Sequence, residues 1–257
     1  MRKLVIGALM GALMLVVTAV AIGASATSGT TVQNYSQTFS AKKVSTSAGT
    51  TFETSSTDEQ NPRNKQPKRV TNFDLTFPSG TKIDNKAVPQ CKATETDFAN
   101  ETNPDNACPK GSKIGSGTVT ARLPFQGTAD LNGTVTAYNA NKGLLLYVVI
   151  QSPLGNQVLL IKPKFSGIHL NTVVPHTCIP PNRPDQDCKD SSGQEQAAIL
   201  TSFKLKTTPK SSGSGAKKKI LIKTPPKCTG KWKFKADIKY SDGTSVSIPT
   251  TQACTKK

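Results

Sequence analysis

The stretch Lys231-Trp232-Lys233-Phe234-Lys235-Ala236-Asp237-Ile238-Lys239-Tyr240 alternates strictly between charged and apolar side chains. Successive side chains of a β-strand point to opposite faces, so this period of two places every apolar side chain on one face. The dipeptide Asp242-Gly243 follows, and it is typical of a tight hairpin turn. Residues 245–249 then return with Val246 and Ile248 on the apolar side. The sequence therefore predicts a β-hairpin with one face in the core.

Short strand-like segments recur upstream of this hairpin, separated by turn residues. Residues 144–150 are continuously apolar, which predicts a central strand covered on both faces. Residues 92–99 are the one helical candidate of note. The pattern predicts an all-β fold, an antiparallel β-sandwich of immunoglobulin-like or related type with little helix. The segments expected as strands are residues 35–44, 50–56, 70–77, 114–123, 133–139, 144–151, 157–161, 168–174 and 199–205.

The N-terminus has the pattern of an export signal. A positive Met1-Arg2-Lys3 precedes an uncharged, apolar run over residues 4–23, and Ala24-Ser25-Ala26 is typical of a signal-peptidase site. We therefore expect a signal peptide over residues 1–26, with an uncleaved membrane anchor as the alternative. A flexible N-terminus over 27–33 and a β-sandwich domain over 34–257 would follow, with a division into two sub-layers near residue 110 left open. The expected location is secreted or at the cell surface.

The six cysteines all lie beyond this segment. An even number of cysteines in an exported chain is typical of disulfides, and local spacing favours three neighbouring pairs. The alternative, a metal site, lacks a CxxC pair and a second histidine at ligand-like spacing. The predicted bridges are Cys91–Cys108, Cys178–Cys188 and Cys228–Cys254.

The charge of the chain is strongly positive. Its 257 residues include 33 Lys and Arg against 16 Asp and Glu, a formal net charge of +17. Lysines concentrate in the last quarter, where same-face strand residues lie about 6.8 Å apart, within a Debye length of about 8 Å. Such a surface would attract anionic cell-wall polymers, acidic polysaccharide or lipid headgroups, although exposed strand lysines also guard against aggregation. No specific nucleic-acid partner is expected. The candidate polyanion-binding residues are Lys204, Lys206, Lys217, Lys219, Lys223, Lys231, Lys233, Lys235 and Lys239.

Catalytic patterns are weak. His169 and His176 could serve as a base, but neither lies in a recognisable motif and no Gly-x-Ser-x-Gly elbow is present. Four acids inside the proposed Cys91–Cys108 loop could supply oxygen ligands to Ca²⁺, but their spacing is not that of an EF-hand. These acids are Glu95, Asp97, Glu101 and Asp105. We therefore expect no catalytic residue, no metal and no cofactor.

Three motifs carry a resemblance to a known group of proteins. They are LTFPSGT at 75–81 running on to Pro89-Gln90-Cys91, ACPKGSKIGSG at 107–117, and Pro226-Lys227-Cys228 with GKW at 230–232 and YSDGT at 240–244. In these motifs the chain resembles exported, β-rich proteins of actinobacterial type for which no activity is assigned. The resemblance implies export, a β fold and the terminal disulfides, and it implies no catalytic residue.

Taken together, these features predict a non-enzymatic, exported binding or structural module that contacts anionic polymers through its Lys-rich sheet face. The alternative is a secreted hydrolase whose active site is built from loops. A concave pocket that joins a histidine to a carboxylate and a hydroxyl would favour the hydrolase, whereas a flat Lys-lined sheet would favour binding.

Overall fold

The structure, a computed structural model, describes residues 23–61, 65–122, 130–151, 156–176 and 197–256. The short helical elements are α1 (Glu95–Ala99), η1 (Pro104–Ala107) and η2 (Gly215–Lys217). The strands are β1 (Ala24–Ser28), β2 (Thr31–Phe39), β3 (Thr50–Thr57), β4 (Val70–Thr76), β5 (Lys82–Ile83), β6 (Lys113–Arg122), β7 (Asp130–Ala140), β8 (Gly143–Ile150), β9 (Gln157–Ile161), β10 (Lys164–Ser166), β11 (His169–Val173), β12 (Ile199–Thr207), β13 (Ser211–Ser212), β14 (Lys219–Ile220), β15 (Ile222–Lys223), β16 (Lys231–Tyr240) and β17 (Ser245–Ala253).

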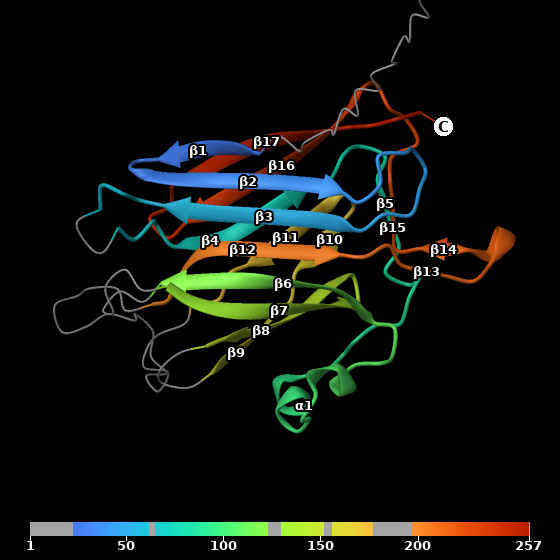
Figure 1. Ribbon diagram of the computed structural model, residues 1–257, viewed down its shortest axis with the longest axis horizontal. Coiled ribbons are helices and arrows are strands. Elements are labelled where there is room, and N and C mark those ends of the chain that lie inside the picture. The colour runs from blue at the N-terminus through green and yellow to red at the C-terminus, as the bar shows by residue number, and fades with distance from the viewer. Residues whose placement is uncertain (1–22, 62–64, 123–129, 152–155, 177–196, 257) are drawn as a thin grey trace, which may run out of the picture.

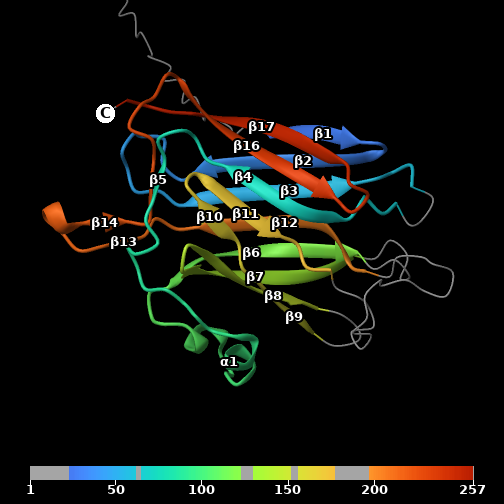
Figure 2. The same cartoon turned by 180° about the vertical axis from the view of Figure 1, so that it is seen from behind.

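Thirteen of these strands form one antiparallel sheet in the order β1-β2-β3-β12-β6-β7-β8-β10-β11-β4-β16-β17, with β9 also paired to β8. The sheet curls over until its two edges, β1 and β17, lie against each other (Figure 1). Strands β2, β3, β12 and β6 form one layer, and β4, β11 and β10 form the other (Figure 2). The predicted all-β, sandwich-like fold with little helix is confirmed, in the form of a nearly closed sheet.

The C-terminal hairpin has the predicted orientation. Along β16 the side chains alternate between exposed and buried, and Trp232, Phe234, Ala236, Ile238 and Tyr240 are all buried. Strand β16 pairs with β17 over nine residue pairs, from Lys231 opposite Ala253 to Lys239 opposite Ser245. A disulfide joins Cys228 to Cys254 at the open end, as predicted. The hairpin therefore contributes an apolar face to the main core and a charged face to the surface.

Strand β8 is covered on both faces, as its continuous apolar run predicts. Its Leu144, Leu146 and Val148 face the main core, whereas Leu145 packs in a second, smaller cluster on the outside. The Cys91–Cys108 segment supplies this outer cover, because Phe98 of α1 stacks on Tyr147 at 4.6 Å between ring centroids. The predicted Cys91–Cys108 bridge is thus confirmed, and it holds a lid over the outer face of the sheet.

Side chains close the seam between the first and last strands. At one end, the Gln252 amide of β17 accepts from the Phe39 backbone N–H (2.8 Å) and donates to the Phe39 carbonyl (2.8 Å). At the other end, Lys68 donates to Ser28 (3.0 Å) and pairs with Asp242 (2.7 Å), which lies in the β16–β17 turn. The hydrogen bond from Lys68 lowers the pKa of Asp242 to about 2. The seam is therefore bridged at both ends without continuous strand pairing.

The N-terminal boundaries differ from those expected. Residues 27–28 belong to β1 and residues 31–33 to β2, within the segment for which the sequence predicts a flexible N-terminus. Thr31 and Gln33 are polar but buried, because Thr31 donates to Asp58 (3.0 Å) and Gln33 to Thr54 (2.6 Å). The predicted cleavage point after Ala26 falls inside β1, and residues 1–22 lie outside the described part of the chain.

The domain does not divide near residue 110. Strand β4, which precedes that point, pairs with both β11 and β16, which follow it. Strand β3 likewise pairs with β12. All the long described strands therefore belong to one continuous sheet around one main core.

Candidate functional site

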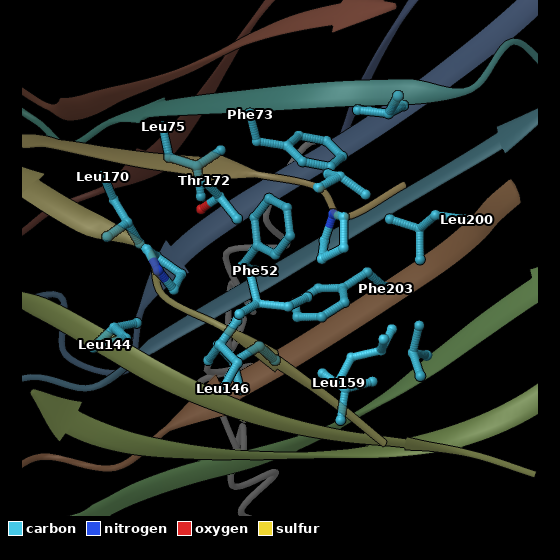
Figure 3. A pocket seen from close by; sticks show the side chains of 18 of the residues that line it. Phe52, Phe73, Leu75, Leu144, Leu146, Leu159, Leu170, Thr172, Leu200 and Phe203 are labelled. Carbon is cyan, nitrogen blue, oxygen red and sulfur yellow. The ribbon is translucent and has the colours of Figure 1, made fainter. Parts of the chain in front are cut away.

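An apolar cavity of about 130 Å³ lies between the two layers of the sheet. Figure 3 shows side chains from both layers converging on it, with Phe52 and Phe203 on one side and Phe73, Leu75 and Leu170 on the other. Its other labelled lining residues are Leu144, Leu146, Leu159, Thr172 and Leu200. These residues occupy inward-facing positions on strands whose side chains alternate between the two faces of the sheet. The cavity therefore lies inside the core that this alternation forms.

Aromatic rings give the cavity a firm wall. The Phe52 ring lies 6.1 Å from that of Phe73 and 5.7 Å from that of Phe203, measured between centroids. At the opposite end, Phe77 and Phe165 lie 6.3 Å apart. Edge-to-face and tilted ring pairs at these separations are favourable and restrict ring motion. Part of the cavity wall is therefore made of aromatic rings that contact one another.

The sheet splits beside this cavity. Strand β9 pairs with residues 146–150 of β8, whereas β10 pairs with β8 only at Gly143. A side chain at Gly143 would overlap the Pro163 carbonyl, so glycine allows the chain to cross from β9 to β10 here. Within the described residues, β9 and β11 share no pairing. The wall is consequently weakest between these two strands.

Half-buried side chains line the cavity at this split. Leu159 of β9 and Thr172 of β11 both line the cavity and are partly exposed to solvent. On the outer surface of the same two strands, Val158 is 47% exposed and Val173 is 68% exposed. They are the large apolar side chains most exposed in the described chain. Partly exposed lining residues therefore lie on both of the strands that border the split.

Two of the neutral polar side chains in the lining, Gln37 and Thr207, accept hydrogen bonds from neighbouring groups. Gln37 accepts a hydrogen bond from the Tyr35 hydroxyl (2.5 Å), and Thr207 accepts from the Thr50 backbone N–H (2.8 Å). Burial raises the pKa of Tyr35 well above its usual range, so this hydroxyl stays protonated as a donor. Because most of the lining is aliphatic or aromatic, the cavity offers an occupant mainly dispersion and hydrophobic contacts.

The cavity has a free-energy cost when it is empty. Protein interiors are normally close-packed, and an unfilled cavity of 130 Å³ would cost about 3 kcal/mol at 24 cal/mol per Å³. Engineered apolar cavities of about 150 Å³ stay dry and accept small apolar molecules. Binding of an apolar molecule in the cavity would therefore offset this free-energy cost and stabilise the folded protein.

The predicted polyanion-binding lysines do not form one surface. Lys204 and Lys206 lie on β12, and Lys204 pairs with Glu53 (2.6 Å). Lysines 231, 233, 235 and 239 lie on the exposed face of β16, and Lys235 pairs with Asp237 (2.7 Å). Strands β12 and β16 are not neighbours in the sheet, and Lys217, Lys219 and Lys223 lie in short elements outside it. Only the β16 group remains a contiguous row.

His169 does meet a carboxylate and a hydroxyl. Its Nδ1 lies 3.2 Å from Asp74 Oδ1 and 3.2 Å from Thr76 Oγ1. Both contacts use the same ring nitrogen, whereas a catalytic triad uses one nitrogen for the acid and the other for the nucleophile. The three residues also lie on the exposed face of the sheet, on β4 and β11. This arrangement is not that of a hydrolytic triad.

Two of the four acids considered for calcium, Asp97 and Asp105, accept hydrogen bonds within the chain. Asp97 accepts from the Thr94 backbone N–H (2.7 Å) in the capping box of α1, and this hydrogen bond lowers its pKa. Asp105 accepts from Lys113 (2.7 Å) and from the Tyr138 hydroxyl (2.6 Å), and these bonds lower its pKa as well. No group of three or more His, Cys, Asp or Glu in the described residues could hold a metal ion.

The third predicted bridge, Cys178–Cys188, lies outside the described residues. The two bridges that are described are compatible with an extracytoplasmic location. Among the described residues, no helix has both the length and the apolar character needed to cross a membrane.

Comparisons with known proteins give no relative for this chain: no protein-family model, no curated protein and no solved structure matches it. The cavity residues were missed as a site by sequence reasoning because their inward, apolar pattern is the same as that of an ordinary core.

Proposed function

We propose that this protein is a secreted or cell-surface, non-enzymatic binding protein that holds an apolar ligand, such as an aliphatic chain, between the layers of its sheet. The cavity is the observation that carries the proposal. It is lined from both layers by aliphatic and aromatic side chains, and half-buried residues lie at the split between β9 and β11. The disulfides and the signal-like N-terminus support an extracytoplasmic site of action.

A substitution at the split tests this function. Thr172→Phe adds a ring to an inward, half-buried position and should fill the entrance. The neutral apolar dye N-phenyl-1-naphthylamine should bind the wild type saturably with increased fluorescence, and its affinity should fall at least about tenfold in Thr172→Phe. Asn171→Phe is the matched control, because residue 171 lies on the same strand but on the exposed face.

The control should keep wild-type dye affinity. If the wild type shows no saturable binding, or if both phenylalanine variants bind the dye as the wild type does, the cavity is not the ligand site. Thermal unfolding of both variants, measured by circular dichroism, verifies that each is folded at the assay temperature.

A second candidate function is contact with an anionic polymer through the β16 lysines. Lys231, Lys233 and Lys235 are exposed side by side along one strand, opposite the uncharged Ala253, Thr251 and Pro249 of β17. Their positive potentials would add at low ionic strength. Replacing all three by Ser should abolish salt-dependent binding to an acidic polymer such as polyglutamate. Replacing Lys204 and Lys206 on β12 by Ser is the control, and it should leave most of the salt-dependent binding. If both variants lose the same amount of binding, the β16 lysines are not the binding surface.

A further inference from the structure

The cavity runs along most of strand β8. Leu144, near the start of the strand, and Ile150, at its end, both line the cavity, and so does Leu146 between them. Six residue steps of about 3.3 Å each separate Leu144 from Ile150, which gives the cavity a length of about 20 Å along the strand. Figure 3 shows the same direction in space, with Leu144 and Leu170 at one end and Leu200 at the other.

The volume of the cavity is small for that length. One water needs about 10–15 Å³ of such space, so a cavity of about 130 Å³ holds about ten water-sized spheres. About seven spheres of about 2.8 Å diameter, placed end to end, already occupy a length of about 20 Å. The cavity is therefore a file between one and two spheres wide. A single alkyl chain fits this width, whereas two chains side by side do not.

The lining is buried at the Leu144 end of the cavity. Phe77, Leu144 and Ile222 line this end, and all three are buried. Phe165 is half-buried there, and its ring packs on that of Phe77, with 6.3 Å between the centroids. Ile222 belongs to the small β5–β15 sheet, which lies at this end of the main sheet (Figure 1). Bulky apolar side chains therefore close the cavity at the start of β8.

The lining is partly exposed at the Ile150 end. Gln157 pairs with Ile150 and is half-buried, and the same is true of Val174 just beyond β11 and of Leu200 near the start of β12. Among the described residues, the cavity thus has one buried end and one end whose side chains reach solvent.

From these dimensions we infer that the ligand carries a single unbranched alkyl chain, which enters methyl end first from the Ile150 end, and that Leu144 limits the length of chain accepted. An extended alkyl chain advances about 1.3 Å for each carbon, from a bond length of about 1.5 Å at the tetrahedral angle. A space of about 20 Å therefore takes up about 14–16 carbons. The inference rests on the proposed function and adds the number, direction and length of the chains.

A series of unbranched alkanoates tests the length limit in the wild type. Alkanoates of 8 to 20 carbons, each below its critical micelle concentration, are titrated against bound N-phenyl-1-naphthylamine. Each CH₂ group that enters the cavity should strengthen binding about fourfold, so affinity should rise steeply up to about 14–16 carbons and then stop rising. The branched isomer 2-hexyldecanoate has the same sixteen carbons as hexadecanoate. It should displace the dye at least about tenfold less well, because its two arms do not fit side by side.

Matched variants assign the limit to Leu144. Leu144→Ala lengthens the space at the closed end and should move the limit up by about two carbons, whereas Leu144→Phe should move it down by about two. Leu146→Ala is the matched control, because it is the same truncation of a buried lining residue on the same strand, in the middle of the cavity. It should leave the length limit unchanged. Thermal unfolding measured by circular dichroism verifies that each variant is folded at the assay temperature.

The outcomes distinguish this inference from the proposed function. If the dye does not bind the wild type saturably, the proposed function itself is contradicted. If the dye binds but affinity still rises at 20 carbons, if no alkanoate displaces the dye, or if the branched isomer binds as well as hexadecanoate, the single-chain cavity is overturned and the proposed function is kept. These comparisons need only the wild type. An unchanged limit in a folded Leu144 variant, or an equal shift in Leu146→Ala, overturns the role of Leu144.

Discussion

Replacing Phe234 by Ala should destabilise the protein more than any other single change discussed above. The Phe234 side chain is 1% exposed, and its ring lies 5.1 Å from that of Phe39 on β2. Phe39 also contacts Trp232 and Phe77, so one truncation opens the aromatic cluster that joins β2 to β16. Large-to-small changes of this kind cost about 3–5 kcal/mol in the free energy of unfolding. Urea unfolding followed by circular dichroism measures the change.

Lys233→Ala is the control for that experiment. Lys233 is the preceding residue on the same strand and is exposed, so its removal should change stability by no more than about 0.5 kcal/mol. A cost below about 1 kcal/mol for Phe234→Ala would show that the hairpin's apolar face does not lie in the core.

Gln252→Met should produce the second-largest loss of stability. The Gln252 amide satisfies both the N–H and the carbonyl of Phe39 across the seam, and both residues are buried. Methionine keeps the length of the side chain but removes both hydrogen bonds. Leaving a buried backbone group without a partner costs about 1–3 kcal/mol, so two such groups should cost about 2–5 kcal/mol.

Hydrogen exchange locates this effect. In Gln252→Met the amide proton of Phe39 should exchange much faster than in the wild type, whereas amides in the β6–β7 pair should change only with global stability. Thr251→Val, on the adjacent and outward position of β17, should leave the Phe39 proton protected. Unchanged protection of Phe39 in Gln252→Met would mean that the amide does not close the seam.

The sequence predicted those elements whose pattern is local. The alternation over residues 231–240 predicted which face each side chain of β16 points to. The continuous apolar run predicted that both faces of β8 are covered. Two of the cysteine pairings followed from short loops. In each case the residues that make the deciding contacts lie close together along the chain, so a local sequence pattern is sufficient to predict them.

Contacts between distant segments could not be predicted in this way. Gln252 and Phe39 are 213 residues apart, and a buried amide looks like any polar surface residue in the sequence. The same holds for Thr31 and Gln33, whose burial depends on Asp58 and Thr54. Polar residues therefore led to the expectation of a flexible N-terminus where two paired strands are found.

The cavity could not be predicted from the sequence for a related reason. Alternation indicates that Phe52, Leu146 and Phe203 face inward, but it does not indicate how far apart the two layers lie. That separation depends on the curvature of the whole sheet and on the split between β9 and β11.

The most direct test of the proposed ligand site is a crystal structure of the protein soaked with 1-bromododecane, measured at the bromine absorption edge. The account predicts anomalous density for bromine within the space enclosed by Phe52, Leu146, Leu170 and Phe203. Density found only on the outer surface, or a wild-type interior in which these side chains close the space completely, would contradict it.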